Sequence, residues 1–152
     1  MFSKLVHELK ERKLTIGSVE SLTAGLFCSK IAEIPGASAV LRGGLVTYAS
    51  ELKTVLANVD KNLIEIKGVV SEEVAKAMAV GGKEKLNVDI CVSFTGNAGP
   101  TVLDNKKVGE VYMGIAFDDK INVFHHIFIG DRNEIRNFAV QFACEKILQM
   151  LK

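Results

Sequence analysis

The sequence predicts an α/β fold, in which a three-layer α/β/α sandwich surrounds a mixed, mostly parallel sheet of about five strands. Three observations predict it. Segments with the apolar spacing of helices alternate along the chain with short β-type runs. The last two of these runs are joined by Asp118-Asp119-Lys120, a connection tight enough for an antiparallel hairpin. Hydrophobic residues make up 48% of the chain and there are two prolines, so we expect one domain over residues 1–152 without disordered linkers.

The elements of the first half follow from apolar spacing and from end signals. Leu5 and Leu9 belong to a stripe of apolar side chains three and four residues apart, which is typical of an amphipathic helix. The hydroxyls of Ser21 and Thr23 are expected to cap the second helix, which ends before a Pro-Gly pair. In order, we expect a helix, a strand, a helix, a strand and a helix over residues 2–12, 15–20, 21–32, 41–49 and 51–57.

The second half begins with a helix that Ser71 and two following glutamates start, because acidic side chains are favourable at the positive end of the helix dipole. Gly81-Gly82 is expected to weaken its middle. Asp131 and Glu134 have the spacing of a capping box for the last helix. In order, we expect a helix, three strands and a helix over residues 71–86, 89–94, 108–117, 121–129 and 131–151.

The distribution of charge indicates a small-molecule ligand. Nineteen basic residues oppose eighteen acidic ones and are scattered along the chain, unlike the basic patch of a nucleic-acid binder. No stretch approaches the roughly 18 apolar residues of a membrane span, and the N-terminus lacks the apolar segment of a signal peptide. We therefore expect a cytoplasmic protein with no direct nucleic-acid or membrane contacts, and its apolar composition favours a homo-oligomer.

The cysteines and histidines are expected to be structural. Cys28, Cys91 and Cys144 lie far apart in apolar stretches, which is typical of buried free thiols. His125 and His126 are neighbours in a predicted strand, where successive residues face opposite sides, so we expect one in the core and one at the surface. We expect no metal site and no cofactor.

Three predicted loops leave the carboxyl ends of strands, where ligands bind in α/β folds. They are the turn at Ser21, the connection from Tyr48 to Lys53, and the loop from Thr95 to Pro100. Ser21 is either a helix cap or a nucleophile. Lys53 is either a solvated lysine or a base whose pKa is lowered by burial. Tyr48 is either a core residue or a group that relays a proton or orients the amine.

The glycine-rich loop of residues 95–100 can present backbone N–H groups to a phosphate or a carbonyl oxygen, because glycines allow close approach. It lacks the Lys-Ser/Thr ending of a P-loop and the spacing of a dinucleotide fingerprint, which disfavours ATP and NAD enzymes. Arg42, Arg132 and Arg136 are either anion contacts or solvated side chains.

Together these segments resemble the C-terminal domain of the CinA family, from about residue 10 to the end of the chain. Eight motifs stand in the order of the family. They are Val19-Glu20-Ser21-Leu22-Thr23-Ala24-Gly25, Pro35-Gly36-Ala37-Ser38, Arg42-Gly43-Gly44-Leu45-Val46-Thr47-Tyr48, Lys53, Gly68-Val69-Val70-Ser71-Glu72-Glu73-Val74, Thr95-Gly96-Asn97-Ala98-Gly99-Pro100, Val108-Gly109 and Gly130-Asp131-Arg132.

This resemblance implies a serine–lysine amidase of pyridine-nucleotide and NAD metabolism. Its reaction would be deamidation of nicotinamide mononucleotide to nicotinate mononucleotide and ammonia, without a metal. The implied roles are nucleophile for Ser21, general base for Lys53 and helper of the lysine for Tyr48. Further contacts with the substrate, including its phosphate, are expected from Glu20, Thr23, Arg42, Thr95, Gly96, Asn97, Ala98, Gly99 and Arg132.

The departures from the family pattern lie in the loops. Leu22 and Ala24 stand where the family has cysteine and glycine, Asn97 replaces an isoleucine, and residues 101–105 replace a glycine- and proline-rich loop. These changes support a second hypothesis, a non-catalytic binding module associated with competence or DNA repair. A lowered pKa of Lys53 would favour the enzyme. Larger family members carry an additional N-terminal domain, whose activities we do not expect in 152 residues.

Overall fold

Five strands form one sheet in the computed structural model, which describes residues 1–152. The strands β2, β1 and β3 pair in parallel, and β3, β4 and β5 pair antiparallel, in the order β2-β1-β3-β4-β5. The predicted mixed sheet and its closing hairpin are thereby confirmed. The strand bounds are β1 (Ile16–Glu20), β2 (Leu41–Val46), β3 (Ile90–Gly96), β4 (Glu110–Phe117) and β5 (Lys120–Ile127).

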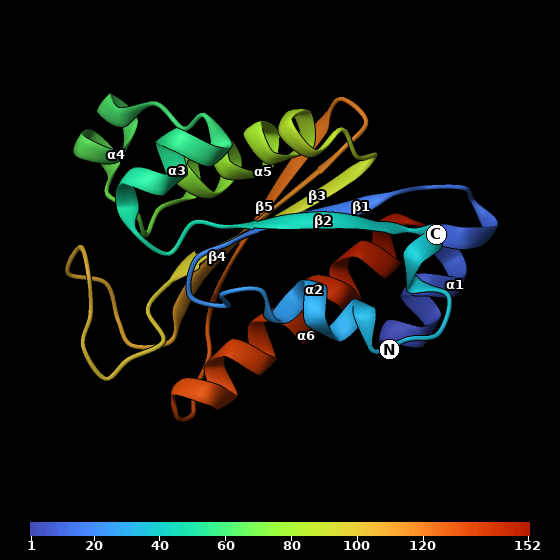
Figure 1. Ribbon diagram of the computed structural model, residues 1–152. Coiled ribbons are helices and arrows are strands. Elements are labelled where there is room, and N and C mark those ends of the chain that lie inside the picture. Colours follow the sequence, from blue (N-terminus) through green and yellow to red (C-terminus); the bar gives the residue numbers. More distant parts are fainter.

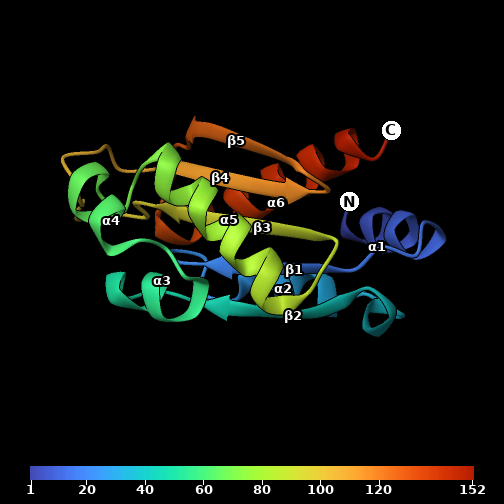
Figure 2. The same cartoon turned by 90° about the horizontal axis from the view of Figure 1, so that it is seen from above.

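Two layers of helices cover the two faces of the sheet, which confirms the predicted sandwich (Figure 1). Figure 2 shows α5 lying across the central strands of the sheet. None of the helices is long and apolar enough to cross a membrane. One layer consists of α1 (Phe2–Glu11), α2 (Leu26–Ala32) and α6 (Arg132–Met150), and the other of α3 (Ser50–Ala57), α4 (Lys61–Lys67) and α5 (Glu72–Leu86).

Some elements differ from those predicted. α4 and the 3₁₀ helix η1 (Ala37–Ala39) were not predicted. α4 has only seven residues, fewer than the roughly 11–18 over which apolar periodicity identifies a helix in a sequence, and its Leu63 and Ile64 are only partly buried. β2 ends at Val46 and β5 at Ile127, each two or three residues earlier than predicted.

Two of the three predicted helix caps are confirmed. Ser71 Oγ accepts a backbone N–H of the first turn of α5 at 3.3 Å, and Asp131 and Glu134 form the capping box of α6. The predicted cap at the Ser21 turn is wrong. α2 begins after Gly25, which has a φ of 97°, and no hydroxyl caps it.

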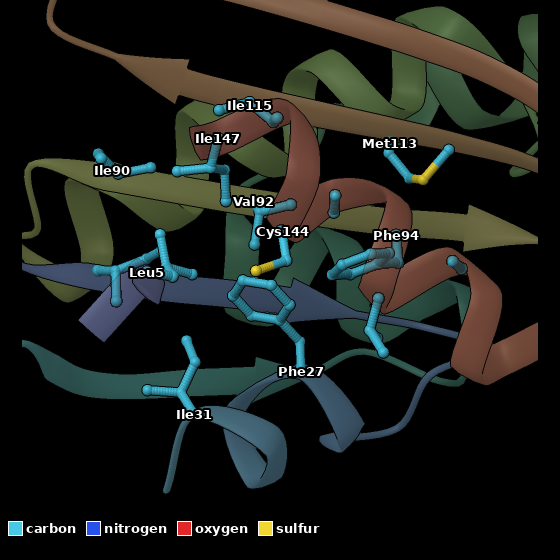
Figure 3. Close-up of a cluster of buried hydrophobic side chains, with 14 of the residues drawn as sticks. Leu5, Phe27, Ile31, Ile90, Val92, Phe94, Met113, Ile115, Cys144 and Ile147 are labelled. Carbon is cyan, nitrogen blue, oxygen red and sulfur yellow. The ribbon is translucent and has the colours of Figure 1, made fainter. Parts of the chain in front are cut away.

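The larger hydrophobic core lies between the sheet and the layer of α1, α2 and α6 (Figure 3). Successive strand residues face opposite sides, so alternate residues of β3 enter this core while Ser93 faces α5 and donates to the Ala75 carbonyl at 2.6 Å. The strand residues Ile90, Val92, Phe94, Met113 and Ile115 pack there with Leu5, Phe27, Ile31, Cys144 and Ile147 of the helices.

The three cysteines are free, as predicted, but only two of them are fully buried. Cys91 and Cys144 are inaccessible, whereas Cys28 is partly exposed beside Ser18. Burial raises the pKa of Cys28 to about 11 and that of the other two thiols to about 12. All three thiols therefore stay protonated near neutral pH.

Both histidines of β5 are exposed, so the prediction of one core histidine is wrong. They do face opposite sides of the sheet. His125 bonds to Glu110 at 2.8 Å and stacks on Tyr112, whereas His126 packs on the ring of Phe128 with centroids 4.5 Å apart. The reason is that β5 is an edge strand, which the helices cover only in part.

α5 packs closely on its neighbours because two glycines lie in its middle. A Cβ at Gly81 would lie 1.6 Å from the carbonyl oxygen of Ala57 at the end of α3. A Cβ at Gly82 would lie 2.2 Å from Val19 Cγ2 on β1. These glycines therefore permit the short distances between α5, α3 and β1.

Gly81→Ala is expected to destabilise the protein, although alanine favours a helix by about 1 kcal/mol. The added methyl group must displace the end of α3, and overpacking of this kind costs roughly 1–3 kcal/mol. Urea unfolding followed by circular dichroism measures the change. The control is Lys76→Ala on the exposed side of α5, which should stay within about 0.5 kcal/mol of the wild type. An unchanged stability of Gly81→Ala would contradict this packing.

Candidate active site

The end of β1 leads into a tight turn that carries Ser21. The Ser21 N–H donates to the Phe94 carbonyl of β3 at 3.0 Å, and the Ser21 carbonyl accepts from the Ala24 N–H at 3.0 Å. Ala24 has a φ of 47° and Gly25 one of 97°, so two successive residues are left-handed. The turn forms with alanine at the first of these positions, at a strain cost of about 1 kcal/mol relative to glycine.

Glu20 holds the first turn of α2. Its carboxylate is buried and accepts three backbone N–H groups at 2.9 to 3.3 Å and the hydroxyl of Ser18 at 2.7 Å. A carboxylate is favourable there because the N-terminus of a helix carries partial positive charge. Glu20 therefore caps α2 in place of Ser21, and the Ser21 hydroxyl stays available.

Lys53 reaches Ser21 from α3. Its side chain is 1% exposed, so it is not a solvated lysine. Nζ donates to the Thr47 carbonyl at 2.9 Å and to Ser21 Oγ at 3.2 Å, and it forms no ion pair. The amine thus meets only neutral oxygen atoms at hydrogen-bond distance.

Burial lowers the pKa of Lys53 from 10.5 to about 8. The negative charges of Glu51 and Asp104 act in the opposite direction, but the loss of hydration outweighs them. Near neutral pH a share of Lys53 is therefore the neutral amine, whose lone pair can accept the Ser21 proton. A hydroxyl next to such an amine has the composition of an activated nucleophile.

Ser21 borders a cavity of about 180 Å³ at the carboxyl ends of β1 and β3. The turn after β1, the connection after β2 and the loop after β3 form it together with the first residue of α6. The three loops that the sequence predicts at this edge therefore do meet. The lining residues are Ser21, Leu22, Tyr48, Gly96, Asn97, Ala98, Gly99, Thr101, Leu103 and Arg132.

Unpaired backbone donors also lie at this cavity. The N–H groups of Leu22, Ala98 and Gly99 have no hydrogen-bond partner within the chain, and all three residues line the cavity. Backbone donors of this kind can stabilise a developing oxyanion. The residue directly after a nucleophilic serine often provides one of them, which is the place of Leu22.

Arg132 connects the segments around the cavity. Nη2 donates to the Tyr48 hydroxyl at 2.8 Å and Nη1 to the Gly99 carbonyl at 2.6 Å. Tyr48 is 55% exposed and makes no hydrogen bond with Lys53 or Ser21. Tyr48 is therefore neither a core residue nor a direct partner of the lysine.

Four of the predicted substrate contacts do not line the cavity. Glu20 is engaged with α2, and Thr23 is buried with a hydroxyl that has no partner. Thr95 donates to the carbonyl of Val69 at 2.6 Å. Arg42 lies at the amino end of β2 and donates to the Leu86 carbonyl. The cavity is at the carboxyl ends of the strands, so the length of β2 separates Arg42 from it.

Several residues that contribute to the site were not predicted. Thr47 acts through its backbone carbonyl, for which a pattern of side chains gives no signal. Thr101 and Leu103 lie in the loop that departs from the family pattern, and that departure could have pointed to them. Arg136, left open between an anion contact and a solvated side chain, holds the Ser21 turn. It donates to the carbonyls of Leu22 and Thr23 at 2.9 and 3.0 Å.

Comparison with known proteins matches nearly the whole chain to one family. The model of the CinA C-terminal domain family matches residues 1–151. A relative from Lactiplantibacillus plantarum, described as competence-damage inducible, is 44% identical over 141 residues, or 92% of this chain and 34% of the relative. A CinA-like protein of Petrotoga mobilis is 41% identical over 145 residues, or 95% of this chain and 36% of that protein. This chain thus spans about a third of the length of these relatives.

Two solved structures share the fold. A competence-damaged protein (CinA) superfamily protein from Escherichia coli matches with a TM-score of 0.95 at 27% identity, covering 98% of this chain and 87% of that one. The competence/damage inducible protein CihA from Agrobacterium tumefaciens matches with a TM-score of 0.89 at 30% identity, covering 99% of this chain and 96% of that one.

The burial of Lys53 is expected to make stability rise with pH above about 8. Between pH 8 and 10.5 the folded state has released the Lys53 proton, whereas the unfolded state still binds it. Because the unfolded state then binds more protons, the free energy of unfolding increases with pH, by up to about 3 kcal/mol over this window. Urea unfolding at several pH values compares the wild type with Lys53→Met, which should lack this increase. Parallel pH profiles of the two proteins would contradict a depressed lysine pKa.

Proposed function

Because this chain belongs to the CinA C-terminal domain family, we propose that it is an amidohydrolase that converts nicotinamide mononucleotide and water to nicotinate mononucleotide and ammonia. The observation that carries the proposal is the 3.2 Å contact between Lys53 Nζ and Ser21 Oγ at the edge of a cavity. A buried lysine without an ion pair is costly to fold, so its place beside a hydroxyl favours a chemical role.

In the first half of the reaction, the neutral amine of Lys53 accepts the proton of Ser21 Oγ while Oγ forms a bond to the carboxamide carbon. The carbonyl oxygen becomes an oxyanion, to which the N–H groups of Leu22 and Ala98 donate. When the oxyanion collapses, the C–N bond breaks and Lys53 passes its proton to the leaving nitrogen. Ammonia departs and an acyl ester of Ser21 remains.

Water takes part in the second half. Lys53, neutral again, accepts a proton from water as the water oxygen attacks the ester carbon. The same backbone donors stabilise the second oxyanion. Its collapse releases the carboxylic acid, and Ser21 Oγ regains its proton from Lys53. One amine therefore handles every proton transfer, and it must be neutral at the start of each half.

The cavity suits the nicotinamide end of the substrate. Its volume of about 180 Å³ is below the roughly 300–1,000 Å³ of pockets that enclose drug-sized ligands. A ring carboxamide therefore occupies it while the ribose phosphate extends outside. Arg132 uses two of its five N–H donors on Tyr48 and Gly99, which leaves three for the phosphate. In this arrangement Tyr48 assists by orienting Arg132.

The alternative of a non-catalytic binding module for competence or DNA repair is less well supported. A binding module does not require a lysine with a lowered pKa, whereas burial lowers the pKa of Lys53 to about 8. The altered loops are its main support, yet they leave Ser21 and Lys53 in contact.

Ammonia release from nicotinamide mononucleotide by the purified protein tests the proposal. Ser21→Ala and Lys53→Ala should each lower kcat by about 10³-fold or more, because each removes a member of a pair that acts as a unit. The matched control is Lys61→Ala, an exposed lysine of α4, which should keep wild-type activity. Activity that survives in Ser21→Ala would remove Ser21 from the mechanism. A folded but inert wild type would overturn the amidase and favour the binding module.

The rate should also depend on pH through Lys53. Only the neutral amine accepts a proton, so kcat/KM should rise about tenfold per pH unit below the lysine pKa and level off above about pH 8. Lys53→Arg should be inactive at every pH, because a guanidinium stays protonated. A pH-independent rate from about pH 6 to 9 would argue against Lys53 as the base.

A further inference from the structure

One wall of the cavity belongs to the segment between β3 and β4 and is formed by Thr101 and Leu103. The side chain of Asn97 fixes the position of Leu103. Asn97 Nδ2 donates to the Leu103 carbonyl at 3.2 Å, and Asn97 Oδ1 accepts from the Leu103 N–H at 3.0 Å. Asn97 is 4% exposed, and both ends of its amide are engaged with one residue. Asn97 therefore sets the position of Leu103.

A second anchor holds the residue that follows. The Asp104 carboxylate accepts the Val70 N–H at 2.9 Å and lies against Gly68, where a Cβ would be 2.8 Å from it. Asp104 and Asn105 have φ values of 56° and 55°, so the chain turns sharply after Leu103. Leu103 is thus held from both sides although it is 57% exposed.

We propose that Leu103 is a specificity-determining residue, whose side chain packs against the planar ring of the substrate and selects ring carboxamides over short aliphatic amides. This inference rests on the proposed amidase function and names the substrate feature that the wall recognises. Among the aliphatic residues of the cavity, Leu22 and Ala98 are 5% and 6% exposed, against 57% for Leu103. Leu103 therefore has the most apolar surface to remove from water when a ring binds.

The test is steady-state ammonia release from nicotinamide mononucleotide and from propionamide. Leu103→Ala should raise KM for the ring carboxamide about tenfold, the scale of a lost apolar contact in a pocket, with a smaller change in kcat. The kcat/KM for propionamide should change by less than about twofold. Val102→Ala is the matched control, because Val102 is an exposed apolar neighbour, 45% accessible, that does not line the cavity. Val102→Ala should leave kcat/KM for both amides unchanged.

The role of Asn97 is tested in the same assay. Asn97→Ala should reproduce the loss of selectivity, because it releases Leu103 from its place. The double variant of Asn97→Ala and Leu103→Ala should be no less selective than Leu103→Ala alone, since both changes act through one side chain. Additive losses in the double variant would overturn the proposal. An equal loss of kcat/KM for both substrates in Leu103→Ala would also overturn the proposal, because it would indicate a merely structural role.

Ligand binding separates this proposal from a failure of the amidase itself. If the wild type releases ammonia from neither amide, the amidase proposal fails, and calorimetric titration with nicotinamide decides on Leu103. Nicotinamide binding that is about tenfold weaker in Leu103→Ala but unchanged in Val102→Ala supports the proposed contact between Leu103 and the ring. Equal binding by all three proteins, or no binding by the wild type, overturns it.

Discussion

One buried carboxylate, that of Glu20, determines how β1 passes into α2 and therefore where Ser21 lies. α2 has seven residues and no hydroxyl cap, so it would not form as an isolated helix in water. Glu20 supplies negative charge at its N-terminus, and three N–H donors with the Ser18 hydroxyl offset the cost of burying that charge. Because a strand residue does the capping, the serine between strand and helix has a hydroxyl that can bond to Lys53.

The position of Lys53, the proposed base, depends on packing at the other face of the sheet. α3 carries Lys53, and its last residue, Ala57, lies against Gly81 of α5. α5 in turn lies close to β1 through Gly82. α3 can therefore approach the sheet closely enough for a lysine with a buried stem to reach the residue after β1. One layer of the sandwich fixes Ser21, the other fixes Lys53, and the two side chains meet at the end of β1.

The fold is predictable from the sequence because its signals are local. Hydrophobic periodicity and the caps at Ser71 and Asp131 involve residues a few positions apart, whereas α4, with seven residues, is too short to show such a periodicity. The site is less predictable because its distances are set across the fold. Arg42 is six residues from Tyr48 in sequence, yet β2 places the two at opposite ends. Likewise, the sequence suggests Lys53 as a base, but its burial follows from the packing of α3. Its amine donates to the backbone carbonyl of Thr47, which no pattern of side chains indicates.

The surroundings of Lys53 meet two opposing requirements of its proposed role as a base. A base must be neutral near the working pH, which burial achieves, but it must also carry a proton briefly, which burial disfavours. The amine contacts only the Thr47 carbonyl and the Ser21 hydroxyl, so no direct ion pair keeps it protonated. Glu51 and Asp104 lie beyond ion-pair distance and still favour the ammonium form. Asp104 directly follows Leu103 in the loop, so the segment that lines the cavity also acts to raise the pKa of Lys53. In the proposed reaction, a change in that loop therefore acts on substrate fit and on proton transfer together.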